Sequence, residues 1–319
     1  MFQLVRVLLT GASGFIGSRL AHQLDQLDHV SLACAVRRSG SAVRGKECVV
    51  GELNAITDWT AVLGGQDVLI HAAARAHVMK DETEDPLAEY RKVNVDGTLN
   101  LARQAAEAGV RRFIFVSSIK VNGEQTAEGR PFNAESTPAP EDAYGISKME
   151  AEKALQALAE ETGMEVVIIR PPLVYGPGVK GNFATMIKLL KKGFPLPLGA
   201  IHNKRSLVAL DNLVDLIITC IDHAEAVNQV FLAGDGEDLS TSELLRGIGK
   251  AMGQPARLIP VPRGMLMFAA GILGKKAVAQ RVLGSLQVDI SKARYLLGWE
   301  PPLSVEHGLR RCFHSENVF

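Results

Sequence analysis

The stretch that decides the fold is Leu4-Val-Arg-Val-Leu-Leu-Thr10, followed by Gly11-Ala-Ser-Gly14-Phe-Ile-Gly17 and then Ser18-Arg-Leu-Ala-His-Gln-Leu24. An apolar run of strand length passes through three glycines into a segment whose apolar residues recur at helical spacing. Glycines let a backbone approach a ligand closely, and the free N–H groups of a helix N-terminus suit a pyrophosphate. The spacing G-x-x-G-x-x-G differs by one residue from the dinucleotide fingerprint. It therefore predicts a dinucleotide site in preference to an ordinary glycine-rich turn.

Strand and helix patterns alternate beyond this opening. Apolar runs at 30–36, 47–53, 67–74, 112–116 and 165–169 predict further strands, and 86–109 predicts a long helix. This alternation predicts an α/β fold, a Rossmann-type doubly wound parallel sheet with ligands outside the carboxyl ends of its strands. We expect residues 1–180 to form the dinucleotide-binding domain, with elements near 206–235 returning to it. Residues 181–319 should form mainly a smaller C-terminal substrate-binding cap.

Composition narrows the class of protein. The 319 residues contain 35 Lys plus Arg and 35 Asp plus Glu, and this balance argues against nonspecific nucleic-acid binding. The four cysteines are scattered without metal-ligand spacing, so no metal site is expected. The chain opens on a strand and not on a signal sequence, and no apolar run reaches spanning length, which predicts a cytoplasmic protein. The apolar segment 265–273 is interpreted as a buried helix of the cap in preference to a membrane-surface helix.

The end of the second strand indicates whether the cofactor is NAD or NADP. Arg37 and Arg38 stand where an acidic residue would bind the ribose 2′-OH of NAD, and arginine there accommodates the 2′-phosphate of NADP. The sequence thus leans towards NADP(H). The alternative is a solvated pair of cations at a strand end.

The sharpest chemical signal is Tyr144-Gly-Ile-Ser-Lys148. On a helix, residues four apart share a face, and a nearby ammonium favours tyrosinate over tyrosine. Tyr144 is therefore a candidate general base for a sugar or alcohol hydroxyl. Ser118, after the strand at 112–116, could bond the same substrate oxygen. His71, at the end of an apolar strand, is interpreted as structural and is assigned no catalytic role.

Several motifs together resemble the extended short-chain dehydrogenase/reductases, in their sugar-nucleotide epimerase/dehydratase branch. The matching pieces, in family order, are the glycine turn, His71-Ala-Ala-Ala74, Asn94-Val-Asp-Gly97-Thr98, Val116-Ser-Ser118, Tyr144-x-x-x-Lys148, Arg170-Pro-Pro-Leu-Val-Tyr-Gly-Pro177, Ser291-Lys-Ala and Leu297-Gly-Trp299. The resemblance implies that Ser118, Tyr144 and Lys148 are catalytic, with Lys148 also holding the nicotinamide ribose.

The resemblance also implies contacts with the cofactor and the substrate. Asn182 and Arg205 should contact the nucleotide diphosphate of a UDP-sugar, and Arg281 is a possible substitute for the family's late arginine. The expected cofactor contacts are Gly11, Ser13, Gly14, Phe15, Ile16, Arg37, Arg38, Glu52, Leu53, Ala72, Ala73, Ala74, Asn94, Tyr144, Lys148 and Pro171.

Three functions follow as hypotheses. The first is epimerisation at C4 of a UDP-hexose or UDP-N-acetylhexosamine. The second is NADPH-dependent reduction of a UDP-4-keto-6-deoxy sugar in surface-polysaccharide synthesis. The third, of another class, is a non-catalytic dinucleotide sensor, which the intact Tyr144 and Lys148 disfavour. The helical patterns at 86–108 and 144–161 suit a four-helix interface, so a homodimer is also expected.

Overall fold

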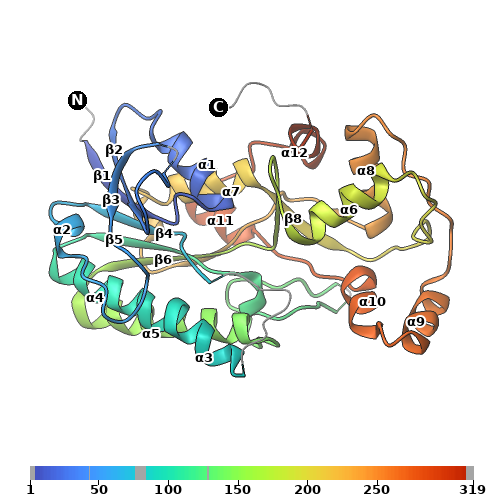
Figure 1. The fold of residues 1–319 in the computed structure, drawn as a ribbon, viewed down its shortest axis with the longest axis horizontal. Coiled ribbons are helices and arrows are strands. Elements are labelled where there is room, and N and C mark those ends of the chain that lie inside the picture. The colour runs from blue at the N-terminus through green and yellow to red at the C-terminus, as the bar shows by residue number, and fades with distance from the viewer. Residues whose placement is uncertain (1–3, 43, 76–83, 128, 314–319) are drawn as a thin grey trace.

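A computed structural model describes residues 4–42, 44–75, 84–127 and 129–313. Its main element is a parallel sheet in the order β3-β2-β1-β4-β5-β6-β9 (Figure 1). These strands are β1 Val5–Thr10, β2 Val30–Val36, β3 Lys46–Val49, β4 Val68–His71, β5 Arg112–Val116, β6 Glu165–Arg170 and β9 Val230–Leu232. The predicted doubly wound fold is confirmed.

The strand order reverses next to β1, which pairs with β2 on one side and with β4 on the other. The chain therefore leaves β1 and β4 in opposite directions, and a crevice opens outside their carboxyl ends. The glycine turn follows β1 directly, at this point. Ligand-binding residues are expected at the same edge, on the segments that follow the strands.

Helices cover both faces of the sheet. α1 Phe15–Leu24, α7 Leu210–Thr219 and α11 Ser291–Leu297 cover one face. The other face carries α2 Thr60–Leu63, α4 Thr98–Glu107 and α5 Ala143–Thr162. Successive side chains of β1 reach the two cores in turn, since Val7 and Leu9 join the first and Leu8 the second. A strand buried on both faces needs apolar residues at every position, which explains the continuous apolar runs.

The predicted helix at 86–109 is interrupted. It consists of α3 Pro86–Arg91, a π-helical segment Lys92–Gly97, and α4. A π-helical turn inside a longer helix redirects side chains and is frequent at functional sites. Asn94 lies within this segment and is buried.

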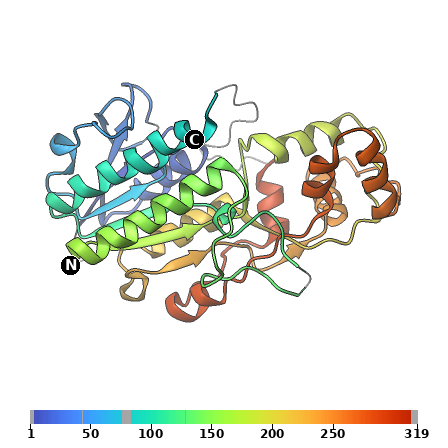
Figure 2. The same ribbon diagram turned by 90° about the horizontal axis from the view of Figure 1, so that it is seen from below.

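The cap surrounds a small sheet in the order β10-β8-β7, made of β7 Leu173–Tyr175, β8 Arg205–Ala209 and β10 Asp238–Leu239. Its helices are α6 Gly181–Lys191, α8 Thr241–Ala251, α9 Arg263–Ile272, α10 Lys276–Leu283 and α12 Val305–Arg311. Short 3-10 turns occur at Ile119–Val121 and Ala224–Ala226. The long connection after β5 also reaches the cap, because the Phe132 N–H donates to the Gln287 carbonyl. Figure 2 shows the cap beside the layered domain.

Two assignments in the C-terminal half differ from the sequence-based expectation. α11, counted there with the cap, packs its Ala293 and Leu297 into the core under the large sheet. The prediction that 265–273 is a buried helix is wrong, because α9 has no buried residue. The apolar composition of this segment reflects a face that the described chain leaves exposed. Among the described residues, no helix has the length and apolarity needed to cross a membrane.

Candidate active site

The glycine turn is shaped by close packing of backbone. Gly11 has φ +77°, and a Cβ on it would lie 2.6 Å from the Ala73 nitrogen. A Cβ on Gly17 would lie 2.0 Å from the Gly11 carbonyl oxygen. The Gly14 N–H donates to that carbonyl at 2.8 Å. A side chain at position 11 or 17 would therefore force this turn, or the segment after β4, to move.

The N-terminus of α1 is open to a ligand. Gly14 is its N-cap residue, and no side chain caps the first N–H groups. Such groups carry the positive end of the helix dipole and bind phosphate well. With the backbone of Ala72 and Ala73 packed against Gly11, these features fit the pyrophosphate of a dinucleotide.

The ends of β2 and β3 carry the residues expected near the adenosine. Arg37 and Arg38 are exposed, and an Arg37 guanidinium nitrogen lies 3.6 Å from a Glu52 carboxylate oxygen. The side chains of Arg37 and Glu52 are 71% and 68% exposed, so this ion pair contributes little to stability. Leu53 packs towards Gly97, where an added Cβ would lie 3.0 Å from the Leu53 Cγ.

His71 is a buried structural residue, in agreement with its interpretation from the sequence. Its Nδ1 lies 2.7 Å from the Thr10 hydroxyl, and its Nε2 lies 3.0 Å from the Thr98 hydroxyl. Burial lowers the pKa of His71 to about 3, so the ring is neutral at ordinary pH. It ties the ends of β1 and β4 to α4.

Tyr144 lies in the first turn of α5. The helix is capped by Asp142, whose carboxylate accepts from the Gly145 N–H at 2.7 Å. The Tyr144 ring meets Tyr90 of α3 edge-on, with centroids 5.9 Å apart. The Ser118 side chain lies close enough to the Tyr144 hydroxyl to lower the pKa of Tyr144, against the larger effect of burial. The structure thus brings together the predicted base and the predicted substrate-binding serine.

Lys148 lies one turn further along α5 and is buried. Its ammonium donates to the Val116 carbonyl at 2.8 Å and lies 4.3 Å from the centroid of the Phe115 ring. Burial lowers the pKa of Lys148 to about 7. The carboxylate of Glu152 opposes this shift.

The expected effect of Lys148 on the tyrosine is not found in this state. The pKa of Tyr144 is raised, chiefly by burial and then by the Asp142 carboxylate and the neighbouring Tyr90 phenol. The nearby Ser118 side chain acts in the opposite direction. The Lys148 ammonium is instead directed at the Val116 carbonyl. Spacing along the helix placed the two residues on one face but did not fix the direction of the ammonium.

Asn94 ties three segments together at this edge. Its side-chain oxygen accepts from the Arg75 N–H at 2.8 Å. Its side-chain nitrogen donates to the Arg75 carbonyl at 3.1 Å and to the Ser147 hydroxyl at 3.0 Å. The segment after β4, the π-helical turn and α5 are thereby held in one arrangement. Its role as a direct cofactor contact stays a prediction.

A buried network next to the predicted catalytic residues was not predicted from the sequence. Glu152 of α5 accepts a bidentate pair of bonds from Arg170 at the end of β6, with its oxygens 2.5–3.1 Å from the guanidinium. Arg170 also donates to the Asn122 side-chain oxygen at 3.1 Å, and the Ser117 hydroxyl donates to Glu152. Glu152 continues the spacing of Tyr144 and Lys148 by another four residues, which is the signal that could have revealed it.

The predicted substrate contacts lie in the cap. Arg205, at the start of β8, donates to the carbonyls of Arg281 at 2.8 Å and Gly284 at 3.1 Å. Arg281 lies 3.6 Å from Glu124. Asn182 is exposed in the first turn of α6. Arg205 and Arg281 are thus adjacent, whereas Pro171, after β6, is buried and accepts from the Ile119 N–H at 3.0 Å.

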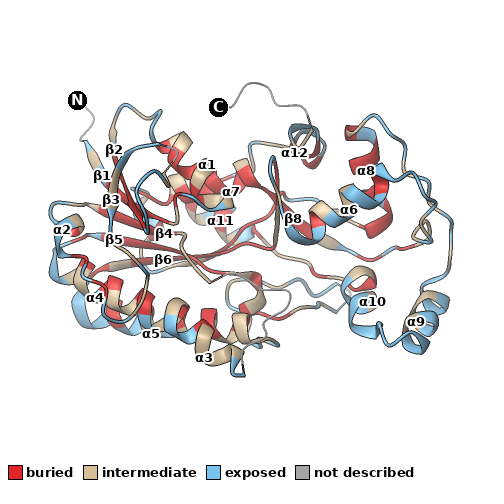
Figure 3. Ribbon diagram, in the orientation of Figure 1, coloured by how far each residue is buried: buried red, intermediate tan, exposed pale blue. Residues whose placement is uncertain are grey.

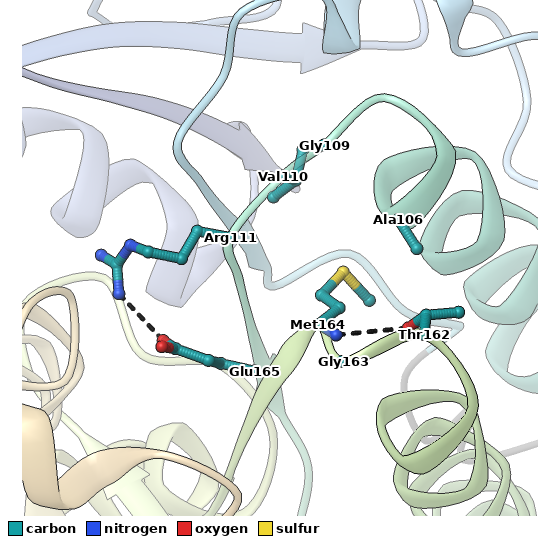
Figure 4. Close-up of a pocket in the computed structure, with 8 residues that line it drawn as sticks. All are labelled: Ala106, Gly109, Val110, Arg111, Thr162, Gly163, Met164 and Glu165. Atoms are coloured by element: carbon teal, nitrogen blue, oxygen red, sulfur yellow. Dashed lines mark hydrogen bonds and ion pairs between the residues drawn. The ribbon is translucent and has the colours of Figure 1, made fainter.

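Two cavities elsewhere contain none of the predicted catalytic residues. The one in Figure 4 has a volume of about 210 Å³ and is lined by Ala106, Gly109, Val110, Arg111, Thr162, Gly163, Met164 and Glu165. These residues lie where α4 and α5 end and β5 and β6 begin. This is the amino edge of the sheet, opposite the glycine turn. In the described residues, no group of three or more His, Cys, Asp or Glu side chains is arranged to hold a metal ion.

Comparisons with known proteins agree with this arrangement. A model of the NAD dependent epimerase/dehydratase family matches residues 7–234. A UDP-glucose 4-epimerase of Vibrio cholerae is 51% identical over 306 residues, covering 96% of this chain and 93% of that protein.

Two solved structures share the fold. A UDP-glucose 4-epimerase of Thermotoga maritima, with UDP-glucose, has a TM-score of 0.75 at 23% identity, covering 97% of each chain. A UDP-N-acetylglucosamine 4-epimerase of Bacillus cereus has a TM-score of 0.77 at 20% identity, covering 97% of this chain and 98% of that one.

The comparisons do not support the leaning towards NADP, because the matching family is described as NAD dependent. The family resemblance inferred from the motifs is confirmed. By its glycine turn, its sheet and these matches, the chain belongs to the NAD-dependent epimerase/dehydratase family.

Proposed function

We propose that this protein is a 4-epimerase of a UDP-hexose or UDP-N-acetylhexosamine. The observation that carries the proposal is the meeting of Ser118 and Tyr144 at the carboxyl edge of the sheet, beside a dinucleotide turn. The chain is also 51% identical to the V. cholerae enzyme named UDP-glucose 4-epimerase. The intact Tyr144 and Lys148 argue against the non-catalytic sensor.

In this proposal, Tyr144 removes the proton from the C4 hydroxyl of the sugar, and Ser118 orients that hydroxyl through a hydrogen bond. The nicotinamide of bound cofactor would accept the hydride from C4 and return it. Tyr144 then gives its proton back to the oxygen of the 4-keto sugar. Inversion at C4 requires the hydride to return to the opposite face of the 4-keto sugar. The sugar must therefore turn over in the site while its nucleotide stays bound.

A division of the chain into two parts would meet this requirement. We propose that residues 1–180, with the returning elements near 206–235, bind the dinucleotide, and that 181–319 form mainly the substrate cap. Arg205 donates to the backbone carbonyl of Arg281, so the two residues belong to one part of the cap, and their guanidinium groups are our candidates to bind the diphosphate. Asn182 would complete this contact from α6.

The reaction is tested by incubating the protein with a panel of UDP-sugars, with and without added NADPH, and identifying products by NMR. Interconversion of C4 epimers without added NADPH is the expected result. No turnover of any UDP-sugar by folded, cofactor-loaded protein would contradict the proposal.

A second candidate is an NADPH-dependent reductase of a UDP-4-keto-6-deoxy sugar. The observation that favours it is the pair Arg37 and Arg38 at the end of β2, where guanidinium groups could bind a 2′-phosphate. Glu52, 3.6 Å from Arg37, weakens this argument because it partly neutralises that cation. Stoichiometric NADPH consumption with a 4-keto substrate would establish the reductase, and NAD retained through purification would favour the epimerase.

We further propose that two copies pair through α3, α4 and α5, which lie side by side on one outer face of the molecule (Figure 2). Two such faces would form the four-helix interface expected from the sequence, in an isologous dimer. Light scattering at micromolar concentration tests the proposal, and a monomer would contradict it. The cytoplasmic location stays a prediction.

A further inference from the structure

α9 and α10 form a helical hairpin, residues 263–283, at the end of the cap far from the large sheet (Figure 1). No residue of α9 is buried, whereas α8, the preceding helix in the chain, has seven buried residues, and Figure 3 shows the contrast by colour. The half-buried residues of α9 are Leu266, Met267 and Ala270. They occupy one side of the helix, and the other side is unpartnered within the described chain.

The unpartnered side carries large apolar side chains. Met265, Phe268 and Ile272 recur at spacings of three and four and therefore share a face. Their exposed fractions are 63%, 72% and 72%. Leu273 and Val278 extend this surface into α10. We name the set Met265, Phe268, Ile272, Leu273 and Val278 the apolar stripe.

The segment that carries the apolar stripe has charges of one sign, although two of its cations pair with carboxylates of other segments, Lys250 with Glu306 and Arg281 with Glu124. Residues 244–288 contain seven basic residues and no Asp or Glu, although the whole chain has equal numbers of both signs. The basic residues are Arg246, Lys250, Arg257, Arg263, Lys275, Lys276 and Arg281, and all are exposed. Lys275 is the N-cap residue of α10 and Lys276 is its first residue, so both lie at the junction with α9, next to the apolar stripe.

We propose that this hairpin docks on a bilayer surface rich in anionic lipid headgroups. The apolar stripe enters the boundary between headgroups and acyl chains, and Arg263, Lys275 and Lys276 contact the phosphates. A helix with large apolar residues on one side and cations beside them is the form that binds such an interface. The inference goes beyond the proposed catalytic function and does not depend on it.

Charge distinguishes this occupant from a second copy of the chain. In an isologous contact the same patch meets itself, so the cations of one hairpin would face those of its partner. Like charges brought together at a desolvated surface oppose association. An anionic bilayer instead complements the cations and takes up the apolar stripe.

Docking would also place the membrane close to the candidate substrate residues. The C-terminal end of α10 contacts β8, since Arg205 donates to the Arg281 carbonyl. A protein held through the hairpin would therefore present its cap to the bilayer surface. The large sheet would remain on the far side.

The test is co-sedimentation of the full chain with vesicles of phosphatidylethanolamine and phosphatidylglycerol, compared with pure phosphatidylcholine. We expect binding to the anionic vesicles that weakens with salt, and little binding to the neutral ones. The double variant Phe268→Ser/Ile272→Ser should have an affinity for the anionic vesicles that is lower by at least roughly tenfold. Lys275→Glu/Lys276→Glu should lose a similar factor. Because these side chains are exposed, both variants should keep the wild-type melting temperature.

Matched controls separate docking from general surface effects. Ile56→Ser/Tyr295→Ser removes two exposed apolar residues elsewhere, which are 90% and 88% exposed, and should bind as wild type. Lys188→Glu/Lys191→Glu makes the same charge change on α6 and should lose much less binding. Absence of vesicle binding, equal binding to neutral vesicles, or full binding by the Phe268→Ser/Ile272→Ser variant would overturn the proposal. An oligomer that this variant dissociates, without vesicle binding by wild type, would assign the apolar stripe to a second copy.

Discussion

Replacing Lys148 by Met should stabilise the protein while abolishing its activity. Lys148 is buried, and its pKa falls from the ordinary 10.5 to about 7. One pKa unit corresponds to about 1.4 kcal/mol, so keeping an ionisable amine here costs on the order of 5 kcal/mol at neutral pH or below. Methionine has a similar length and no charge. Its substitution would also lose the hydrogen bond to Val116 and the contact with Phe115, about 1 kcal/mol each.

The net gain is therefore about 3 kcal/mol, which corresponds to a rise in Tm of roughly 4–5 °C for a chain of this size. The pH dependence identifies the cause. Because the folded pKa of Lys148 lies below its unfolded value, the unfolded chain binds more protons between about pH 7 and 10.5. Wild-type stability from this residue rises with pH over that window. The advantage of the variant should be greatest at pH 7 or below and should shrink towards pH 10.

Calorimetry of Lys148→Met and wild type at pH 7 and pH 9.5, both without cofactor, measures this effect. Lys153→Met, at an exposed position of the same helix, is the control and should change Tm little at either pH. A variant less stable than wild type at pH 7, or an advantage that grows with pH, would refute the assignment of a costly buried amine.

Four other substitutions test the site. Tyr144→Phe should lower turnover roughly 100-fold or more without weakening cofactor binding, as a lost general acid/base does; unchanged turnover in the folded variant would remove Tyr144 from the mechanism. Gly17→Ala should weaken dinucleotide binding and destabilise the fold by about 1–3 kcal/mol, because its Cβ would lie 2.0 Å from the Gly11 carbonyl oxygen. Gly64→Ala is the control and should have neither effect, since the space around its Cβ is open. Equal effects of the two substitutions would argue against a packed turn. Glu152→Gln should destabilise the fold by about 3–5 kcal/mol, because the buried Arg170 loses its charged partner. Urea unfolding measures this cost, and Glu160→Gln, at an exposed position of the same helix, is the control. A cost below about 1 kcal/mol would exclude the Glu152–Arg170 ion pair as a structural support. Arg37→Asp should shift the ratio of the Kd values for NADPH and NADH towards NADH by roughly 10- to 100-fold if Arg37 binds a 2′-phosphate, and calorimetry showing no shift would exclude that contact.

Local sequence determined much of the fold. The apolar runs predicted the strands of the large sheet, since a strand buried on both faces needs an apolar residue at every position. The glycine turn could also be predicted from the sequence, because positions 11 and 17 leave no room for a Cβ and so require glycine. Tyr144 and Lys148 could be placed on one face from their spacing alone, since helical geometry is local.

Contacts between distant segments were decided only by the tertiary structure. The Glu152–Arg170 pair joins a helix to a strand end, and no local pattern links the two residues. The direction of the Lys148 ammonium depends on the Val116 carbonyl and the Phe115 ring of β5, and its pKa depends on how completely they exclude water. α9 has the composition of a buried helix, yet burial requires a partner surface, and the described chain supplies none for its apolar stripe. Periodicity can indicate which face of a helix is apolar, but only the packed structure decides what covers that face.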